Sequence, residues 1–277
     1  PIQANSNPIP GVKISERAEP EEVIFYRNRQ GNRTAWSEQQ LSENDAGFYS
    51  PANFRQGADI MPRNLLFYEV TSSANSRFVN AKTINPITSD LAFTVKDVKK
   101  FQDFSLSQRQ LPVDLFFDIV TSNLLTPFHL ASTQKAFLPI KKNNQNIWEV
   151  LPSNVINAKG AVTRNTFREI YNTLAPTSGT VDTIFDLINT RGKLVQQIVE
   201  QNGYLVFTGA GGGKVCSAYI SMADFDVNTL IMDQTVYWAQ VTSENEAIYL
   251  AGLLNSQSIN QIKQFYLSSH SQFPFYQ

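Results

Sequence analysis

The chain has 277 residues, a formal net charge of −1 and 42% hydrophobic residues, which is typical of a globular protein with one large core or two lobes. No apolar run approaches the roughly 18 residues of a membrane-spanning helix, and a single cysteine, Cys216, allows no internal disulfide; both fit a cytoplasmic protein without a membrane partner. The near-neutral charge argues against uniform electrostatic binding of nucleic acid, because proteins that neutralise phosphates are basic on at least one face.

The first part of the chain is rich in turn-forming and β-forming residues. Residues 1–20 contain Asn-Pro, Pro-Gly and Glu-Pro steps, which predict a linker or arm. From residue 21 to 164, short β-branched and aromatic runs alternate with polar turns and predict a β-rich part. Within it, Pro139 indicates that the run 136–140 is an edge strand, since proline cannot donate to a sheet centre.

Residues 165–202 are expected to form a helical middle segment. Two apolar stripes have the spacing of one helix face: Phe167, Ile170, Tyr171 and Leu174 in the first, and Val181, Ile184, Phe185 and Ile188 in the second. The first stripe ends near Pro176. A break is expected at Gly192, because glycine inside a helix costs about 1 kcal/mol relative to alanine.

The last part, residues 203–277, predicts a hairpin, a strand and two capped helices. The hairpin surrounds the glycine-rich run 208–214, and the strand covers residues 235–241. Capping boxes begin at Ser243 and Ser258, each with Glu or Gln three residues later. The whole chain is therefore expected to be an α+β protein, with β-rich first and last parts around a helical middle.

Residues for familiar catalytic or metal sites are scarce. Two histidines and one cysteine cannot supply a four-ligand zinc site, and His129 is expected to be a packed residue in an apolar turn. The glycine-rich run fails as a phosphate loop, because Thr208 stands where the first glycine is needed and Val215 replaces the Ser/Thr. No catalytic residue, metal or cofactor site is predicted within the chain.

Four short blocks resemble the target-recognition domains of bacterial adenine-specific DNA methyltransferases and of fused restriction–modification enzymes of Type IIG and related kinds. In chain order they are G-A-x-x-x-P-R-x-x-x-F at 57–67, an L-L-P-F-like turn at 124–128, N-x-x-x-K-L-x-x-Q at 189–197, and E-A-x-Y-L-x-x-x-L-N-S at 246–256. The second departs from the pattern, because Thr126 interrupts it. The order of the four blocks makes the resemblance stronger than any single block.

The resemblance implies that the chain recognises a short sequence in double-stranded DNA as the specificity portion of a longer enzyme. An upstream methyltransferase domain, with a nuclease in some relatives, would bind S-adenosylmethionine and carry the chemistry. Neither an (Asn/Asp)-Pro-Pro-(Tyr/Phe) loop nor a methyl-donor motif occurs in this sequence. Arginine suits guanine or phosphate, and glutamine suits adenine. The candidate DNA-binding residues are Arg55, Arg63, Arg77, Lys141, Lys142, Lys193, Gln197 and Lys214.

Each candidate also has a purely structural interpretation. Arg63 can bind carbonyls or a carboxylate at a corner, and Lys193 and Gln197 can lie on a solvated helix face. Two other classes of function stay open: a non-catalytic protein-interaction module and an unrecognised hydrolase. A continuous basic groove would favour DNA, an exposed apolar patch would favour a protein partner, and a deep pocket with converging polar groups would favour a hydrolase.

Overall fold

In the computed structural model the chain divides into two compact units, residues 1–51 and 52–277. The structure describes residues 54–84, 101, 103–209 and 215–260, apart from the side chain of Ser73, and only the backbone of the strands between residues 3 and 37. Lys214, His270 and Gln261, the capping partner expected for Ser258, lie outside the described residues. The cap expected at Ser258 is wrong, because residues 257–260 are already helical and the hydroxyl of Ser256 accepts from the backbone N of Ile259.

The smaller unit contains an antiparallel sheet. Its strands are β1 (Gln3–Ala4), β2 (Ile9–Ser15), β3 (Ala18–Gln30) and β4 (Arg33–Ser37). Strand β3 pairs with each of the other three. Residues 9–15, which the sequence places in an arm, are thus a strand paired with β3.

A six-stranded sheet forms one half of the larger unit, in the order β17-β9-β12-β6-β7-β8. The strands are β6 (Phe67–Ser73), β7 (Phe78–Thr83), β8 (Arg109–Pro112), β9 (Phe116–Val120), β12 (Gln134–Phe137) and β17 (Leu230–Met232). All neighbours are antiparallel except β9 and β17, which are parallel. The prediction of an edge strand at 136–140 is wrong: β12 is flanked by β9 and β6, and Pro139 comes after it.

A four-stranded sheet forms the other half, in the order β16-β15-β18-β5. Its strands are β5 (Arg55–Gln56), β15 (Tyr204–Gly209), β16 (Ser217–Ser221) and β18 (Val236–Val241). Strands β15 and β16 form an antiparallel pair, so the glycine-rich run joins two strands, as predicted, and does not precede a helix. The predicted strand at 235–241 is confirmed as β18.

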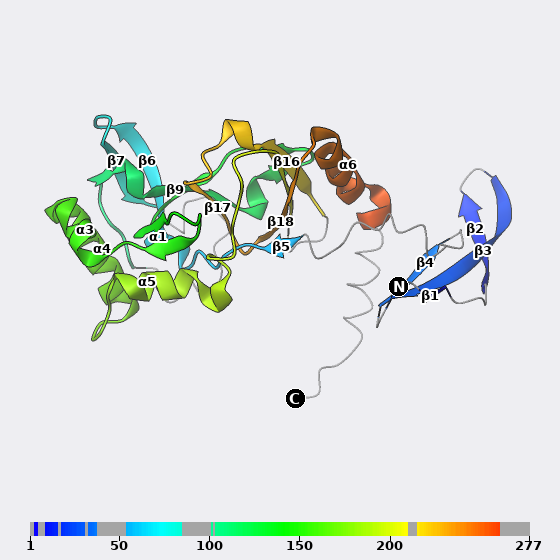
Figure 1. The fold of residues 1–277 in the computed structure, drawn as a ribbon, viewed down its shortest axis with the longest axis horizontal. Helices are drawn as coiled ribbons and strands as arrows, with labels where there is room; N and C mark the ends of the chain where they lie inside the picture. The colour runs from blue at the N-terminus through cyan, green and yellow to red at the C-terminus, as the bar shows by residue number, and fades with distance from the viewer. Residues whose placement is uncertain are drawn as a thin grey trace. The chain divides into compact units, whose positions relative to one another are not determined.

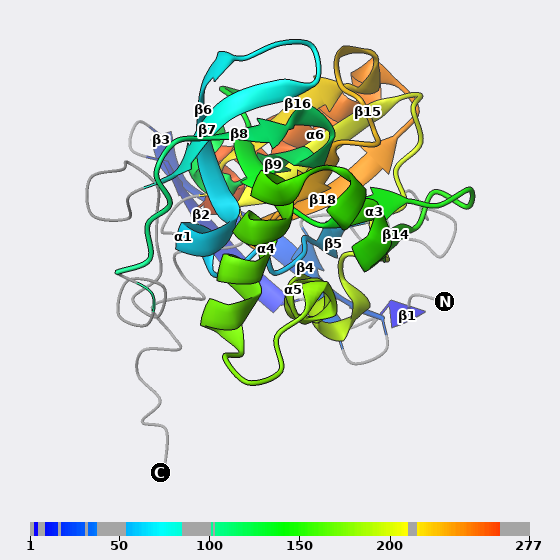
Figure 2. The same cartoon turned by 90° about the vertical axis from the view of Figure 1, so that its left-hand side faces the viewer.

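Helices lie at two ends of the larger unit (Figure 1). They are α1 (Arg63–Leu66), α3 (Ser153–Ala158), α4 (Ala161–Leu174), α5 (Val181–Ile188) and α6 (Glu244–Asn255). Helices α3, α4 and α5 face the viewer in Figure 2, and α6 lies at the opposite end beside β16. Three predicted helices are confirmed as α4, α5 and α6. The helical segment starts earlier than residue 165, because α3 and the first turn of α4 precede it.

Short elements connect the sheets and helices. Two hairpins pair β10 (Leu125–Thr126) with β11 (His129–Leu130), and β13 (Ile140–Lys142) with β14 (Trp148–Val150). Single 3-10 turns are η2 (Val113–Leu115), η3 (Ser122–Leu124), η4 (Thr190–Gly192) and η5 (Met222–Asp224). Among the described residues, no helix combines the length and apolar character needed to cross a membrane.

The chain from Asn189 to Gln197 is not the helix that its spacing suggests. Arg191 and Gly192 both have positive φ, 59° and 68°, and turns follow as far as residue 196. The Asn189 side chain accepts a hydrogen bond from the backbone N of Val195, 3.1 Å away, which stabilises the turn. The break expected at Gly192 is confirmed, but the residues after it do not present a helix face.

Two hydrophobic cores meet at the paired strands β9 and β17. The first core lies between the six-stranded sheet and α4 and α5, where the rings of Phe137 and Phe167 stack at 4.4 Å. The second core lies under the four-stranded sheet. On β17, Ile231 packs into the first core, while Leu230 and Met232 pack into the second, because successive strand residues point to opposite faces. Strand β17 therefore joins the two halves.

Candidate functional site

Arg63 forms a buried ion pair at the end of β17. Its Nη2 lies 2.8 Å from Oδ1 of Asp233, and the two side chains are 2% and 0% exposed. The backbone N and the hydroxyl of Thr235 donate to the same oxygen at 2.9 and 2.7 Å. Burial raises the pKa of Asp233, although Arg63 and Thr235 oppose that shift. The assignment of Arg63 to DNA is wrong: it binds a carboxylate at a corner.

Gln197 is also structural. Its Nε2 donates to the carbonyl O of Met232 at 2.7 Å, and its Oε1 accepts from the backbone N of Met232 at 2.9 Å. The side chain is only 1% exposed. Both polar ends of the amide are therefore hydrogen-bonded to the backbone of β17, which lies 35 residues further along the chain and folds beside Gln197. Gln197 cannot read a base edge in this position, and that assignment is wrong.

The first and third sequence blocks touch each other around this strand. Lys193 Nζ lies 3.4 Å from Asp59 Oδ1, with both side chains largely buried. Arg55 Nη1 donates to the carbonyl O of Gln196 at 3.2 Å. Arg55 is nevertheless exposed, so its guanidinium retains donors that face solvent. Lys193 is less accessible than Arg55, because its side chain is largely buried and its ammonium group is paired with Asp59.

The second and fourth blocks meet at the start of β16. Asn255 Nδ2 donates to the carbonyl O of Ser217 at 2.8 Å, and its Oδ1 accepts from the backbone N of Ser217 at 2.9 Å. The backbone N of Phe128 donates to the same carbonyl at 2.8 Å. Phe128 has a φ of 66°, and its ring lies beside Gly252 of α6. Two pairs of blocks, distant in sequence, therefore each form a hydrogen-bonded junction.

The remaining candidate cations differ in accessibility. Arg77 is exposed in the loop between β6 and β7. Lys141 is exposed and pairs with Glu149 at 3.0 Å. The ammonium of Lys142 is buried 4.9 Å from the centre of the Trp148 ring, and burial lowers its pKa to about 8. Lys142 is therefore not positioned to contact a phosphate, and that assignment is wrong.

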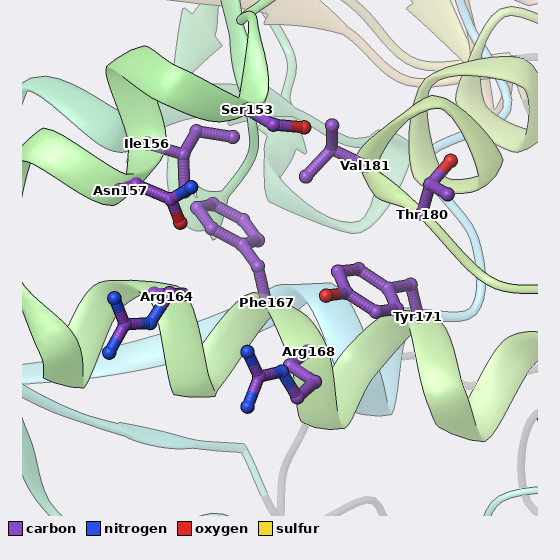
Figure 3. Close-up of a pocket in the computed structure, with 9 residues that line it drawn as sticks. All are labelled: Ser153, Ile156, Asn157, Arg164, Phe167, Arg168, Tyr171, Thr180 and Val181. Atoms are coloured by element: carbon purple, nitrogen blue, oxygen red, sulfur yellow. The ribbon is translucent and has the colours of Figure 1, made fainter.

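A polar hollow opens between α3, α4 and the start of α5 (Figure 3). Its volume is about 400 Å³, and its floor is formed by the buried side chains of Phe167, Ile156 and Val181. Arg164 and Arg168 stand one helical turn apart along its α4 side. None of these residues was a predicted site. The polar groups at the rim belong to Ser153, Asn157, Arg164, Arg168, Tyr171 and Thr180.

The arginines of the hollow lack an acidic partner among the described residues. The acid of α4, Glu169, is held by Arg109 of β8 through two contacts, of 3.0 and 2.9 Å. Positions 164, 167, 168 and 171 share one face of α4, and Arg109 contacts another. The sequence did carry this signal: two arginines lie within the apolar stripe that contains Phe167 and Tyr171. Their meaning depends on α3 and α5 folding against that stripe.

The described residues contain no cluster of three or more His, Cys, Asp or Glu that could hold a metal ion. His129 is exposed, so the prediction that it is packed is wrong. Burial raises the pKa of the Cys216 thiol. Asp114 pairs with Lys159, and Asp118 pairs with Lys135 at 2.8 Å, so these two carboxylates neutralise lysines.

No protein-family model matches the chain, and no curated protein is significantly similar to it. The four sequence blocks and the contacts described above are the observations that bear on its function.

Proposed function

We propose that this chain recognises a short sequence in double-stranded DNA, as the specificity domain of an adenine-specific DNA methyltransferase or restriction–modification enzyme. The methyltransferase domain, with its S-adenosylmethionine site, would lie in polypeptide outside the 277 residues. Phosphate contacts would set the position of the duplex, and a few loop side chains would read base edges. The chain itself would perform no bond-making step.

The observation that supports this proposal most strongly is the pairwise contact between the four blocks. Residues 57–63 meet 193–197 around β17, and 124–128 meet 249–256 around β16. Blocks that had matched by coincidence would have no reason to contact each other across 134 residues of chain, from Asp59 to Lys193, and 124 residues, from Phe128 to Gly252. Their side chains support the backbone, which is consistent with a scaffold that carries different recognition loops in different relatives.

The exposed cations are the residues on which DNA contact then depends. Arg55 on β5 and Arg77 in the loop between β6 and β7 are exposed, and Arg164 and Arg168 add two charges on α4. Many of the other basic side chains are neutralised in ion pairs, which is why the net charge of the chain is a poor guide to its surface. A few accessible arginines are sufficient for recognition when a neighbouring domain supplies further phosphate contacts.

Selection from a random duplex library tests the proposal directly. The purified chain, alone and fused to any adjoining methyltransferase domain, is incubated with the library at low salt, and bound duplexes are sequenced. We expect one short motif to be enriched, and Arg55→Ala or Arg77→Ala to weaken duplex binding or alter the motif. The buried variant Gln197→Ala serves as a control for indirect effects of destabilisation. Absence of any enriched motif from both forms of the protein would refute the proposal.

One observation favours a protein-interaction module instead. Four apolar side chains are exposed near the second junction: Phe128, Ile248, Tyr249 and Leu253, with Tyr249 68% exposed. Exposed apolar side chains that cluster on one surface are typical of protein–protein contact sites. The hydrolase alternative gains no such support, because no carboxylate, histidine or thiol lines the polar hollow. Failure of the duplex selection would leave the interaction module as the better interpretation.

A further inference from the structure

The polar hollow has the charge of an anion site. Arg164 and Arg168 stand at its rim without an acidic partner among the described residues, because Glu169 is committed to Arg109. No acid lines the hollow itself. Two unpaired guanidinium groups so close together repel each other, and an anion bound between them would relieve that repulsion. The hollow is therefore suited to a negatively charged group.

The neutral residues of the hollow narrow the class of ligand. Ser153 and Tyr171 carry hydroxyl groups and Asn157 carries an amide, all of which can donate hydrogen bonds to phosphate oxygens, whereas the hydroxyl of Thr180 already donates to Asp182. Beneath them lie the apolar side chains of Phe167 and Ile156. A volume of about 400 Å³ exceeds what a bare phosphate fills. The remaining space and the apolar floor favour a phosphate attached to an organic group.

We infer that the hollow between α3, α4 and α5 binds the phosphate of a nucleotide unit, with Arg164 and Arg168 as the charged clamp. Arginine presents a planar fork of donors that matches phosphate geometry. The nucleotide unit is either part of a DNA backbone or free in solution. The DNA source rests on the proposed function, whereas binding of a free nucleotide does not.

The free-nucleotide arm measures thermal unfolding of the full chain with deoxyadenosine monophosphate. Deoxyadenosine, which lacks the phosphate, is the matched ligand control, and ionic strength is held constant. Ligand that binds only the folded state raises the melting temperature. We expect the monophosphate to raise it and deoxyadenosine to have no effect. The double variant Arg164→Ala/Arg168→Ala should lose the rise, while Lys82→Ala/Lys135→Ala, which removes the same charge elsewhere, should keep it.

The DNA arm measures duplex affinity between 50 and 200 mM salt for the same proteins. Each phosphate contact contributes about 0.9 to the slope of log affinity against log salt concentration, so losing two contacts should reduce the slope by about 1.8. The loss should be equal for preferred and random duplexes, because phosphate contacts carry no sequence information. Both arginines are exposed, and circular dichroism checks that the double variant folds.

The outcomes separate this inference from the proposed function. If the arginine variant has a reduced salt slope but keeps the nucleotide response, the hollow binds a DNA phosphate. If it loses the nucleotide response but keeps the salt slope, the hollow binds a free nucleotide. If the wild type binds duplex DNA but the arginine variant changes neither measurement, the inference is overturned and the proposed function stands. If the wild type binds no duplex but the arginines are needed for the nucleotide response, the inference stands and the proposed function is overturned. If neither ligand binds, both are overturned.

Discussion

The junction at Arg63 and the hollow at Arg164 use the same type of side chain in opposite ways. Arg63 is buried against Asp233 and holds two distant segments together. Arg164 and Arg168 are exposed and have no acid to neutralise them among the described residues. A buried charge needs a partner, whereas an unpaired charge at the surface remains available to a ligand. Arg63, which lies within a recognisable sequence block, is thus structural, whereas Arg164 and Arg168, which lie outside the four blocks, are available to a ligand.

Arg63→Ala should lower the free energy of unfolding more than any other substitution considered. Removing one partner of a buried pair leaves Asp233 uncompensated, which costs about 3–5 kcal/mol of unfolding free energy. Without Arg63, the carboxyl of Asp233 takes up a proton more readily in the folded state. The loss should therefore be smaller at pH 5 than at pH 8, as measured by urea unfolding at both pH values.

A paired variant sharpens that result. Arg63→Met/Asp233→Asn removes both charges and keeps an oxygen that can accept from Thr235. We expect it to recover most of the lost stability, because neutral replacement of a buried ion pair is often tolerated. Arg164→Ala/Arg168→Ala should change stability by less than about 0.5 kcal/mol, as is usual at the surface. A larger loss there would mean that the hollow is a structural feature.

Gly57→Ala tests how closely the first block approaches β17. A Cβ at this position would overlap the carbonyl oxygens of Met232 and Asp233. These are backbone atoms, and the Ala58 amide bonds to one of them at 2.8 Å, so they cannot move independently. Overpacking of this kind costs roughly 1–3 kcal/mol, and we expect the upper end in urea unfolding. Gly252→Ala is the matched control, since its Cβ would make only ordinary contact with Phe128.

Gln197→Ala should have a smaller effect at the same junction. It leaves the backbone N of Met232, buried between two cores, without its hydrogen-bond acceptor. An unsatisfied buried group costs about 1–3 kcal/mol. Gln196→Ala next to it, which is exposed, should be nearly neutral. Equal stability of both variants in the same unfolding assay would contradict the structural role of Gln197.

Substitution of Lys142 should have the smallest effect on stability, and that effect should appear as a change in how stability depends on pH. Burial lowers its pKa from 10.5 to about 8 in the folded chain. Between these two pH values the unfolded chain binds more protons, so the contribution of this lysine to stability rises as pH increases from 8 to 10.5. Lys142→Met should remove that rise, while Lys141→Ala should retain it. Melting temperatures measured across the window distinguish the two variants.

The sequence predicted those elements whose causes are local. Strand β18 and helix α6 follow from a β-branched run and from the Ser243 cap, which accepts from the backbone N of Glu246. The end of α4 and the break at Gly192 also follow from nearby residues. The central position of β12 could not be predicted from nearby residues, because it depends on pairing with β9 and β6, and Pro139 falls just outside the strand.

Site prediction failed where the deciding partner is remote. Arg63 and Asp233 are 170 residues apart, and Gln197 is 35 residues from Met232, so neither burial nor partner can be read locally. Arg164 and Arg168 were missed for a related reason. Their spacing on one face of α4 is visible in the sequence, but the hollow exists only once α3 and α5 pack beside that face. The sequence blocks coincide with two hydrogen-bonded junctions, whereas the accessible Arg164 and Arg168 lie outside the blocks.

The position of β17 also has a consequence for biosynthesis. The parallel partner of β9 emerges from the ribosome more than 100 residues after β9 itself. Until then, Ile119 and Val120 have an unpaired strand edge, and Arg63 lacks Asp233. Sheet pairing across such a sequence separation is slow and exposes aggregation-prone edges. We therefore expect nascent chains that stop before Asp233 to depend on chaperones, and chains extended through β18 to become protease-resistant in a single step.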